Sequence, residues 1–141
     1  TVAPYCVQGV YHMHLDHKHR HVNEAFTAWD SLCFRGDGGD PEVNSERPTD
    51  LFITRKGETE TAVLPAFSEK WAMKDREMDI ADMLAFWRGD IQHQYGEQAV
   101  HATLVSYLML TDSLSSEEAA RQAVTLWQNR DKQALPFTQS L

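Results

Sequence analysis

The sequence has few cysteines, few basic side chains and no long apolar run. Two cysteines in 141 residues cannot build a disulfide-stabilised scaffold, and a chain of this length does not need one. No stretch approaches the roughly 18 consecutive apolar residues of a membrane-spanning helix, so we expect no membrane contact. The first four residues lack the charged and apolar segments of a signal peptide, and we expect a cytoplasmic protein.

The two cysteines, Cys6 and Cys33, leave two alternatives open. They pair if the start of the first predicted strand lies beside the end of the helix that follows it. Cys6, however, falls on the strand face opposite the apolar one, which is unfavourable for the geometry of a disulfide. The second alternative is a pair of half-buried thiols.

Acidic side chains outnumber basic ones. The chain has 13 Lys and Arg and 21 Asp and Glu, so its formal net charge is −8 with neutral histidines. Nucleic-acid affinity depends on Lys and Arg that release counterions, so we do not expect a nucleic-acid partner. An acidic surface suits a protein partner or self-association instead. The sequence also lacks a glycine-rich phosphate loop, a Gly-x-Ser-x-Gly elbow and a Cys-x-x-Cys motif, so it carries no catalytic signature.

The remaining composition is that of an ordinary globular domain. Hydrophobic residues make up 42% and charged residues 24% of the chain, well away from the composition of disordered chains. Because the length is close to the commonest domain size, we expect residues 1–141 to form a single globular domain.

Hydrophobic periodicity divides the first half of the chain into four segments. Apolar and polar residues alternate over residues 7–15, which predicts a strand. Apolar residues at spacings of three and four then predict a helix over 22–34. Gly, Pro, Asp and Asn over 36–50 predict a surface loop, and two β-branched runs, 51–55 and 61–64, around a Gly turn predict a hairpin.

The second half predicts three helices. The first covers 80–91 and is followed by Gly96, which we expect to interrupt the helical pattern. The second, around 100–109, is apolar over most of its circumference, which is typical of a central buried helix. The third begins with a capping box formed by Ser115 and Glu118.

Together these elements predict an α+β fold with a small antiparallel sheet packed against helices. The sheet would consist of the N-terminal strand and the hairpin. The order of the first five elements is that of a ferredoxin-like βαββα unit, here extended by two C-terminal helices. The alternative is a helical bundle with a β-hairpin attached to it.

Five histidines and an aspartate within residues 12–21 are the most unusual feature of the sequence. On a strand, two alternating histidines project from one face about 6–7 Å apart, which lets their imidazoles converge on one ion. If the helix begins early, His17, His21 and Glu24 lie at helical spacings of four and three and form a second possible set of ligands. Zinc or nickel would suit such a site. The predicted metal ligands are His12, His14, His17, His21 and Glu24. A solvated, pH-responsive edge is the alternative.

A second set of potential ligands, His93, Glu97 and His101, is spaced by fours. These side chains would align only in a helix that continues through Gly96. Because glycine costs about 1 kcal/mol of helix stability relative to alanine, we expect the helix to be broken there.

The sequence therefore favours a non-catalytic accessory or regulatory binding protein that acts through its acidic surface or by self-association, as in a homodimer. One alternative is a transition-metal-binding protein or small metalloenzyme built on residues 12–21. Another is an α+β domain that binds a small molecule between its sheet and its C-terminal helices.

Overall fold

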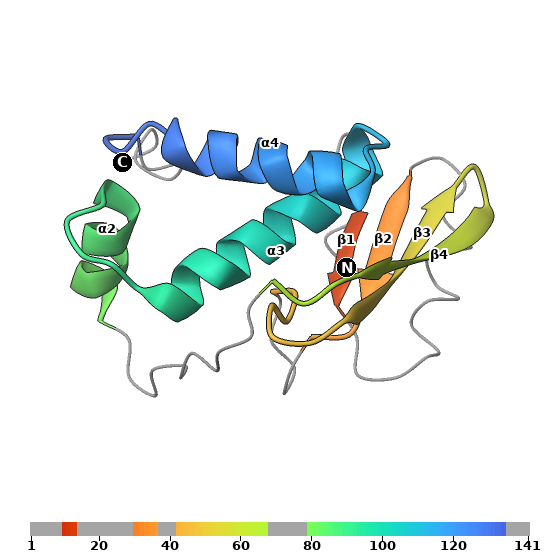
Figure 1. Ribbon diagram of the computed structural model, residues 1–141, viewed down its shortest axis with the longest axis horizontal. Helices are drawn as coiled ribbons and strands as arrows, with labels where there is room; N and C mark the ends of the chain where they lie inside the picture. The colour runs from red at the N-terminus through yellow and green to blue at the C-terminus, as the bar shows by residue number, and fades with distance from the viewer. Residues whose placement is uncertain (1–9, 14–29, 37–41, 68–78, 135–141) are drawn as a thin grey trace.

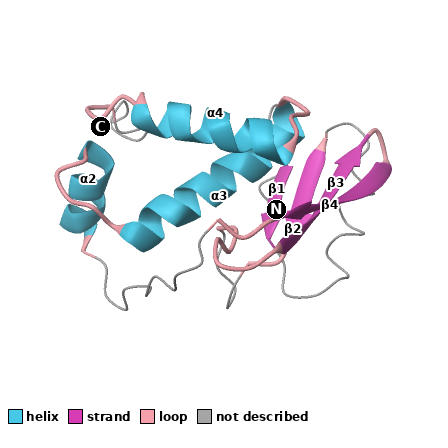
Figure 2. Cartoon of the chain, in the orientation of Figure 1, coloured by secondary structure: helices cyan, strands magenta, loops and turns pink. Residues whose placement is uncertain are grey.

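The computed structural model describes residues 10–13, 30–36, 42–67 and 79–134, with only the backbone described for the first of these ranges. In this part of the chain, four strands precede three helices (Figures 1 and 2). The α+β class is confirmed, and a small sheet packs on helices. The elements are β1 (Val10–Met13), β2 (Ser31–Phe34), β3 (Thr49–Arg55), β4 (Glu58–Leu64), α2 (Ile80–Arg88), α3 (Gln94–Thr111) and α4 (Ser116–Gln128).

The four strands lie in the sheet in the order in which they occur in the chain, β1-β2-β3-β4. Strands β2, β3 and β4 form the expected antiparallel sheet, but β2 takes the place next to the hairpin that was expected for the N-terminal strand, and β1 joins the sheet parallel to β2. In the split βαβ unit of a ferredoxin-like fold another strand separates the two parallel strands. Here β1 and β2 are direct neighbours, so the strand arrangement differs from that fold.

Strand β2 occupies positions where the sequence pattern predicted the end of a helix, and that prediction is wrong for residues 31–34. Leu32 and Phe34 face the core, and all four side chains of the strand are buried. A strand that is buried on both faces loses the polar alternation that would distinguish it from a helix. The rest of the predicted helix, 22–29, lies outside the described residues.

The predicted hairpin is confirmed, and its two strands are longer than expected. A two-residue turn, Lys56–Gly57, joins β3 to β4, and both turn residues have positive φ, 52° and 85°. This conformation matches the right-handed twist of the strands it connects. Because the pairing runs without a gap from Arg55↔Glu58 to Thr49↔Leu64, the hairpin has one continuous register.

The helix boundaries differ from the prediction around Gly96. Helix α2 begins after the N-cap Asp79 and ends at Gly89, whose φ of 82° is accessible to glycine without strain. Helix α3 then starts at Gln94 and continues through Gly96. The expected interruption is therefore wrong, because the helix-ending glycine is Gly89.

The core lies between one face of the sheet and the helix pair α3 and α4. Helix α3 contributes six buried residues, which confirms the central helix expected from its apolar circumference. The capping box at the start of α4 is also confirmed. Val43 is 1% exposed and belongs to the same core, so the segment predicted as a surface loop is partly buried. The core residues of the sheet are Leu32, Phe34, Leu51, Ile53 and Leu64.

None of the helices that the structure describes is both long and apolar enough to cross a membrane. The expectation of a single domain over residues 1–141 stays a prediction.

Candidate functional site

The predicted histidine site lies almost entirely outside the described residues. The backbone of His12 lies in β1, opposite Cys33 of β2. His14, His17, His21 and Glu24 fall outside the described ranges. Among the residues that are described, no group of three or more His, Cys, Asp or Glu side chains could hold a metal ion. A zinc or nickel site at the histidine run therefore stays a prediction.

The cysteine prediction is also left undecided. Cys33 is fully buried in β2, whereas Cys6 lies outside the described residues. Full burial keeps reactants away from the Cys33 sulfur, so this residue is poorly suited to act as a nucleophile.

His93 takes a structural position at the start of α3. Its Nδ1 accepts a hydrogen bond from the backbone N–H of Gly96 at 2.8 Å, and the residue is the N-cap of the helix. A Cβ atom at position 96 would lie 3.0 Å from this Nδ1 and 3.2 Å from the ring of Phe86. A side chain at position 96 would therefore press on both rings, and His93 caps the helix through its ring nitrogen.

His101 lies two turns further along α3, against Trp127 of α4. The two rings meet edge to face, with centroids 6.3 Å apart. The Nε2 atom of His101 is buried and has no hydrogen-bond partner among the described residues. Burial lowers the pKa of His101 below its usual value, and the Glu97 carboxylate offsets part of this effect. His101 is thus a half-buried histidine that favours its neutral form.

Arg130 ties α2 to the end of α4. Its guanidinium lies over the Trp127 ring, 3.5 Å from the ring centroid. It donates hydrogen bonds to the carbonyl oxygens of Trp127 at 2.6 Å, Trp87 at 2.9 Å and Phe86 at 3.4 Å. A cation at the C-terminal ends of helices is favoured by their dipoles. One side chain therefore holds two helix ends and an aromatic cluster together.

Helix α2 has no buried residue, although the sequence predicted an apolar face on it. The exposed fractions are 73% for Ile80 and 50% for Met83, and Ile91 just beyond the helix is 40% exposed. Ile80 and Met83 are neighbours on the helix at a spacing of three, and adjacent large apolar side chains that are exposed are typical of interaction sites. Asp79, Asp82 and Asp90 lie next to the three apolar residues in the sequence, and we call the six residues together the α2 surface.

Helix α2 lies at the end of the molecule away from the sheet (Figure 1). Helix α2 is held there through Phe86 and Trp87, whose rings contact Trp127, and through Arg130. The sequence identified the apolar residues of α2, but it could not show that Phe86 rather than Ile80 makes the contact with the neighbouring helix. Arg130 was missed, because no pattern distinguishes it from a surface arginine.

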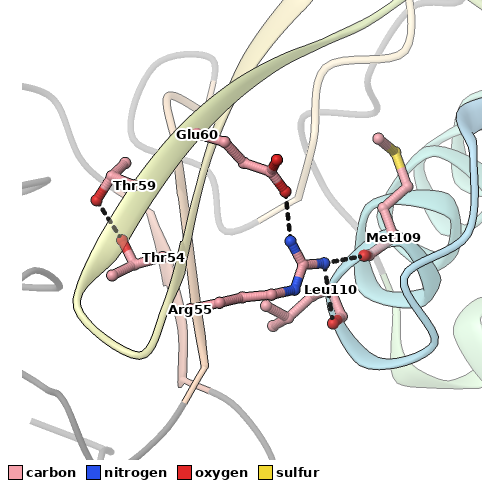
Figure 3. Close-up of polar contacts among 6 residues, drawn as sticks. All are labelled: Thr54, Arg55, Thr59, Glu60, Met109 and Leu110. Atoms are coloured by element: carbon pink, nitrogen blue, oxygen red, sulfur yellow. Dashed lines mark hydrogen bonds and ion pairs between the residues drawn. The ribbon is translucent and has the colours of Figure 1, made fainter.

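A second polar cluster links the hairpin to the helices (Figure 3). Arg55 at the end of β3 donates hydrogen bonds to the carbonyl oxygens of Met109 at 2.7 Å and Leu110 at 3.4 Å, near the end of α3. It also forms an ion pair with Glu60 of β4. The adjoining hollow of about 240 Å³ is lined by Ile53, Arg55, Glu58, Thr59 and Glu60. Because the guanidinium is engaged by protein groups, this cluster holds the sheet against α3.

Comparison of the sequence with protein-family models gave no match, and comparison with curated proteins gave none either.

Proposed function

We propose that the protein is a non-catalytic binding module that recognises a basic, amphipathic helix of a partner protein through the α2 surface. The observation that supports this proposal is the exposure of Ile80 and Met83 on a helix without a buried side chain. Most surface helices turn such residues toward their own core. Covering these side chains with a partner would remove apolar area from water.

Charge defines the class of partner. Asp79, Asp82 and Asp90 adjoin the apolar residues in the sequence, and Arg88 is the basic residue of the helix. A partner helix with apolar residues on one side and Lys or Arg beside them would match both the apolar centre and the acidic rim. The whole chain is acidic, so its field would steer a basic partner toward it.

The attachment of α2 supports a preformed site. Arg130 and the aromatic contacts of Phe86 and Trp87 fix the helix against α4, while Ile80 and Met83 remain exposed. A surface that is ordered before binding loses less conformational entropy when a partner docks.

An amphipathic helical peptide of leucine and lysine can serve as the probe, with intrinsic tryptophan fluorescence as the signal. The double variant Ile80→Ser/Met83→Ser should bind the peptide about tenfold more weakly or worse, because each lost apolar contact is worth on the order of 1 kcal/mol. Val124→Ser is the matched control, since Val124 is an exposed apolar residue of α4 with 40% exposure.

The control variant should keep wild-type affinity, and a peptide with serine in place of leucine should bind weakly to all three proteins. Equal affinity of the wild type and the double variant would refute the proposal. So would equal loss of affinity in the double variant and in Val124→Ser.

A further inference from the structure

Strand β4 forms one outer edge of the sheet. It pairs with β3 on one side, and among the described residues no strand pairs with its other side. Residues 58–61 are exposed, and so is Val63, at 58%. Natural sheets commonly protect such edges with charged side chains, above all lysine, with proline or with a bulge. Strand β4 has no lysine, proline or bulge, and its charged residues are Glu58 and Glu60.

The two-residue turn determines which backbone groups of β4 point outward. Residues that flank such a turn, here Arg55 and Glu58, form a hydrogen-bonded pair, and hydrogen-bonded and non-hydrogen-bonded pairs then alternate along the hairpin. Alternate residues of β4, beginning with Glu58, thus bond to β3. The backbone N–H and C=O groups of Thr59, Thr61 and Val63 point away from β3, toward the open edge.

We propose that β4 pairs antiparallel with β4 of a second copy of the chain, around a two-fold axis at Thr61. In this register Thr61 lies opposite Thr61 of the second copy, and Thr59 lies opposite Val63. All three residues with outward-pointing backbone groups then gain a hydrogen-bonding partner. The two sheets join into one continuous sheet without an open β4 edge.

Two neighbouring registers also place outward-pointing residues of the two copies opposite each other. Each of them leaves Thr59 or Val63 without a full hydrogen-bonding partner. A two-fold axis at Glu60 places Val63 opposite Gly57, which belongs to the turn. An axis at Ala62 places Thr59 opposite Pro65, which has no N–H to donate. The edge is therefore complementary to itself in one register.

Charge favours the same register. Glu58 lies opposite Leu64 of the second copy and Glu60 lies opposite Ala62, so no two carboxylates face each other directly. The axis at Glu60 would place Glu60 opposite itself, and like charges in that position destabilise strand pairing. In the single copy Glu60 already contacts the Arg55 guanidinium (Figure 3).

Sedimentation velocity over a range of protein concentrations tests the pairing. The wild type should form a dimer in a concentration-dependent manner. Thr61→Pro removes an N–H that β3 does not use and should weaken the dimer at least tenfold, because two symmetric hydrogen bonds are lost. Thr61→Val keeps this N–H and should dimerise like the wild type. Circular dichroism should show the same folded spectrum for both variants.

Cysteine cross-linking tests the register without relying on the proline variant. Thr61→Cys should form a covalent dimer on mild oxidation, since opposed residues in a hydrogen-bonded pair have Cα atoms about 5.5 Å apart. In Thr59→Cys the two introduced thiols would be separated by about 13 Å, so cross-linking should not exceed that of the wild type with its native cysteines.

Three results would overturn the proposal. The first is a wild type that stays monomeric up to the highest attainable concentration. In that case a strand of another protein would be the candidate partner of the β4 edge. The second is a Thr61→Pro variant that dimerises as tightly as the wild type. The third is equal cross-linking of Thr59→Cys and Thr61→Cys. Helix α2 lies at the other end of the molecule, so these experiments are independent of the proposed function.

Discussion

At the scale of single residues, His101 makes the stability of the protein depend on pH. The unfolded chain binds a proton at this histidine near pH 6.5, whereas burial against Trp127 moves the pKa of the folded state below that value. As the pH falls below 6.5, the unfolded state binds more protons, so the contribution of His101 to stability is present above this pH and is lost below it.

We therefore expect His101→Phe to lose less stability than the wild type between about pH 7.5 and about pH 5.5, because phenylalanine keeps an edge-to-face contact but cannot be protonated. Urea unfolding at several pH values measures the difference. The other titrating groups are common to both proteins, so the comparison isolates His101. Identical pH dependence in the two proteins would contradict this role.

At the scale of the elements, the packing of α3 against its neighbours favours glycine at position 96, although glycine is a poor helix former. In an ordinary helix, replacing glycine by alanine stabilises by about 1 kcal/mol. A Cβ at this position would press on the His93 cap and on Phe86, which itself contacts Trp127. Both rings make further contacts, Phe86 with Trp127 and His93 with Tyr95, which a shift would disturb.

Gly96→Ala should thus destabilise the protein by about 1 kcal/mol instead of stabilising it, through overpacking and a displaced cap. Chemical denaturation measures this change in the free energy of unfolding. Gln128→Ala at the exposed end of α4 is the control, and it should change stability by less than about 0.5 kcal/mol. A stabilised Gly96→Ala variant would show that the two rings move aside without loss.

The same elements show what the sequence could and could not predict. The capping box of α4, the Asp79 cap of α2 and the glycine turn of the hairpin were predictable because each depends on a short-range pattern. Strand β2 was not, because its packing on both faces erases the alternation that marks a strand. The candidate site was predictable only in part, since the exposure of Ile80 depends on which half of α2 contacts α4.

At the scale of the whole molecule, the acidic charge opposes the association of two copies. The formal charge is −8 at pH 7, so two chains repel each other at long range. Dissolved salt screens this repulsion within about 10 Å at 0.1 M but leaves the hydrogen bonds of a paired edge largely intact.

The dimer should therefore be tighter at about 0.15 M salt than at about 0.01 M, where the screening length is near 30 Å. Sedimentation equilibrium at the two ionic strengths gives the dissociation constants. The Thr61→Pro variant has the same net charge as the wild type and should remain largely monomeric at both ionic strengths. A dimer that weakens as salt is added would indicate association through opposite charges instead of strand pairing.

Because α2 has no buried side chain, the residues proposed to bind a partner differ from those that stabilise the fold. Ile80 and Met83, in the first half of the helix, are at least half exposed, whereas Phe86, Trp87 and Arg130 secure its second half. Substitutions at Ile80 and Met83 can therefore accumulate with little effect on the stability of the fold. Related chains could thus diverge in partner choice while they keep one architecture, and the same two positions offer a starting point for engineering new specificity.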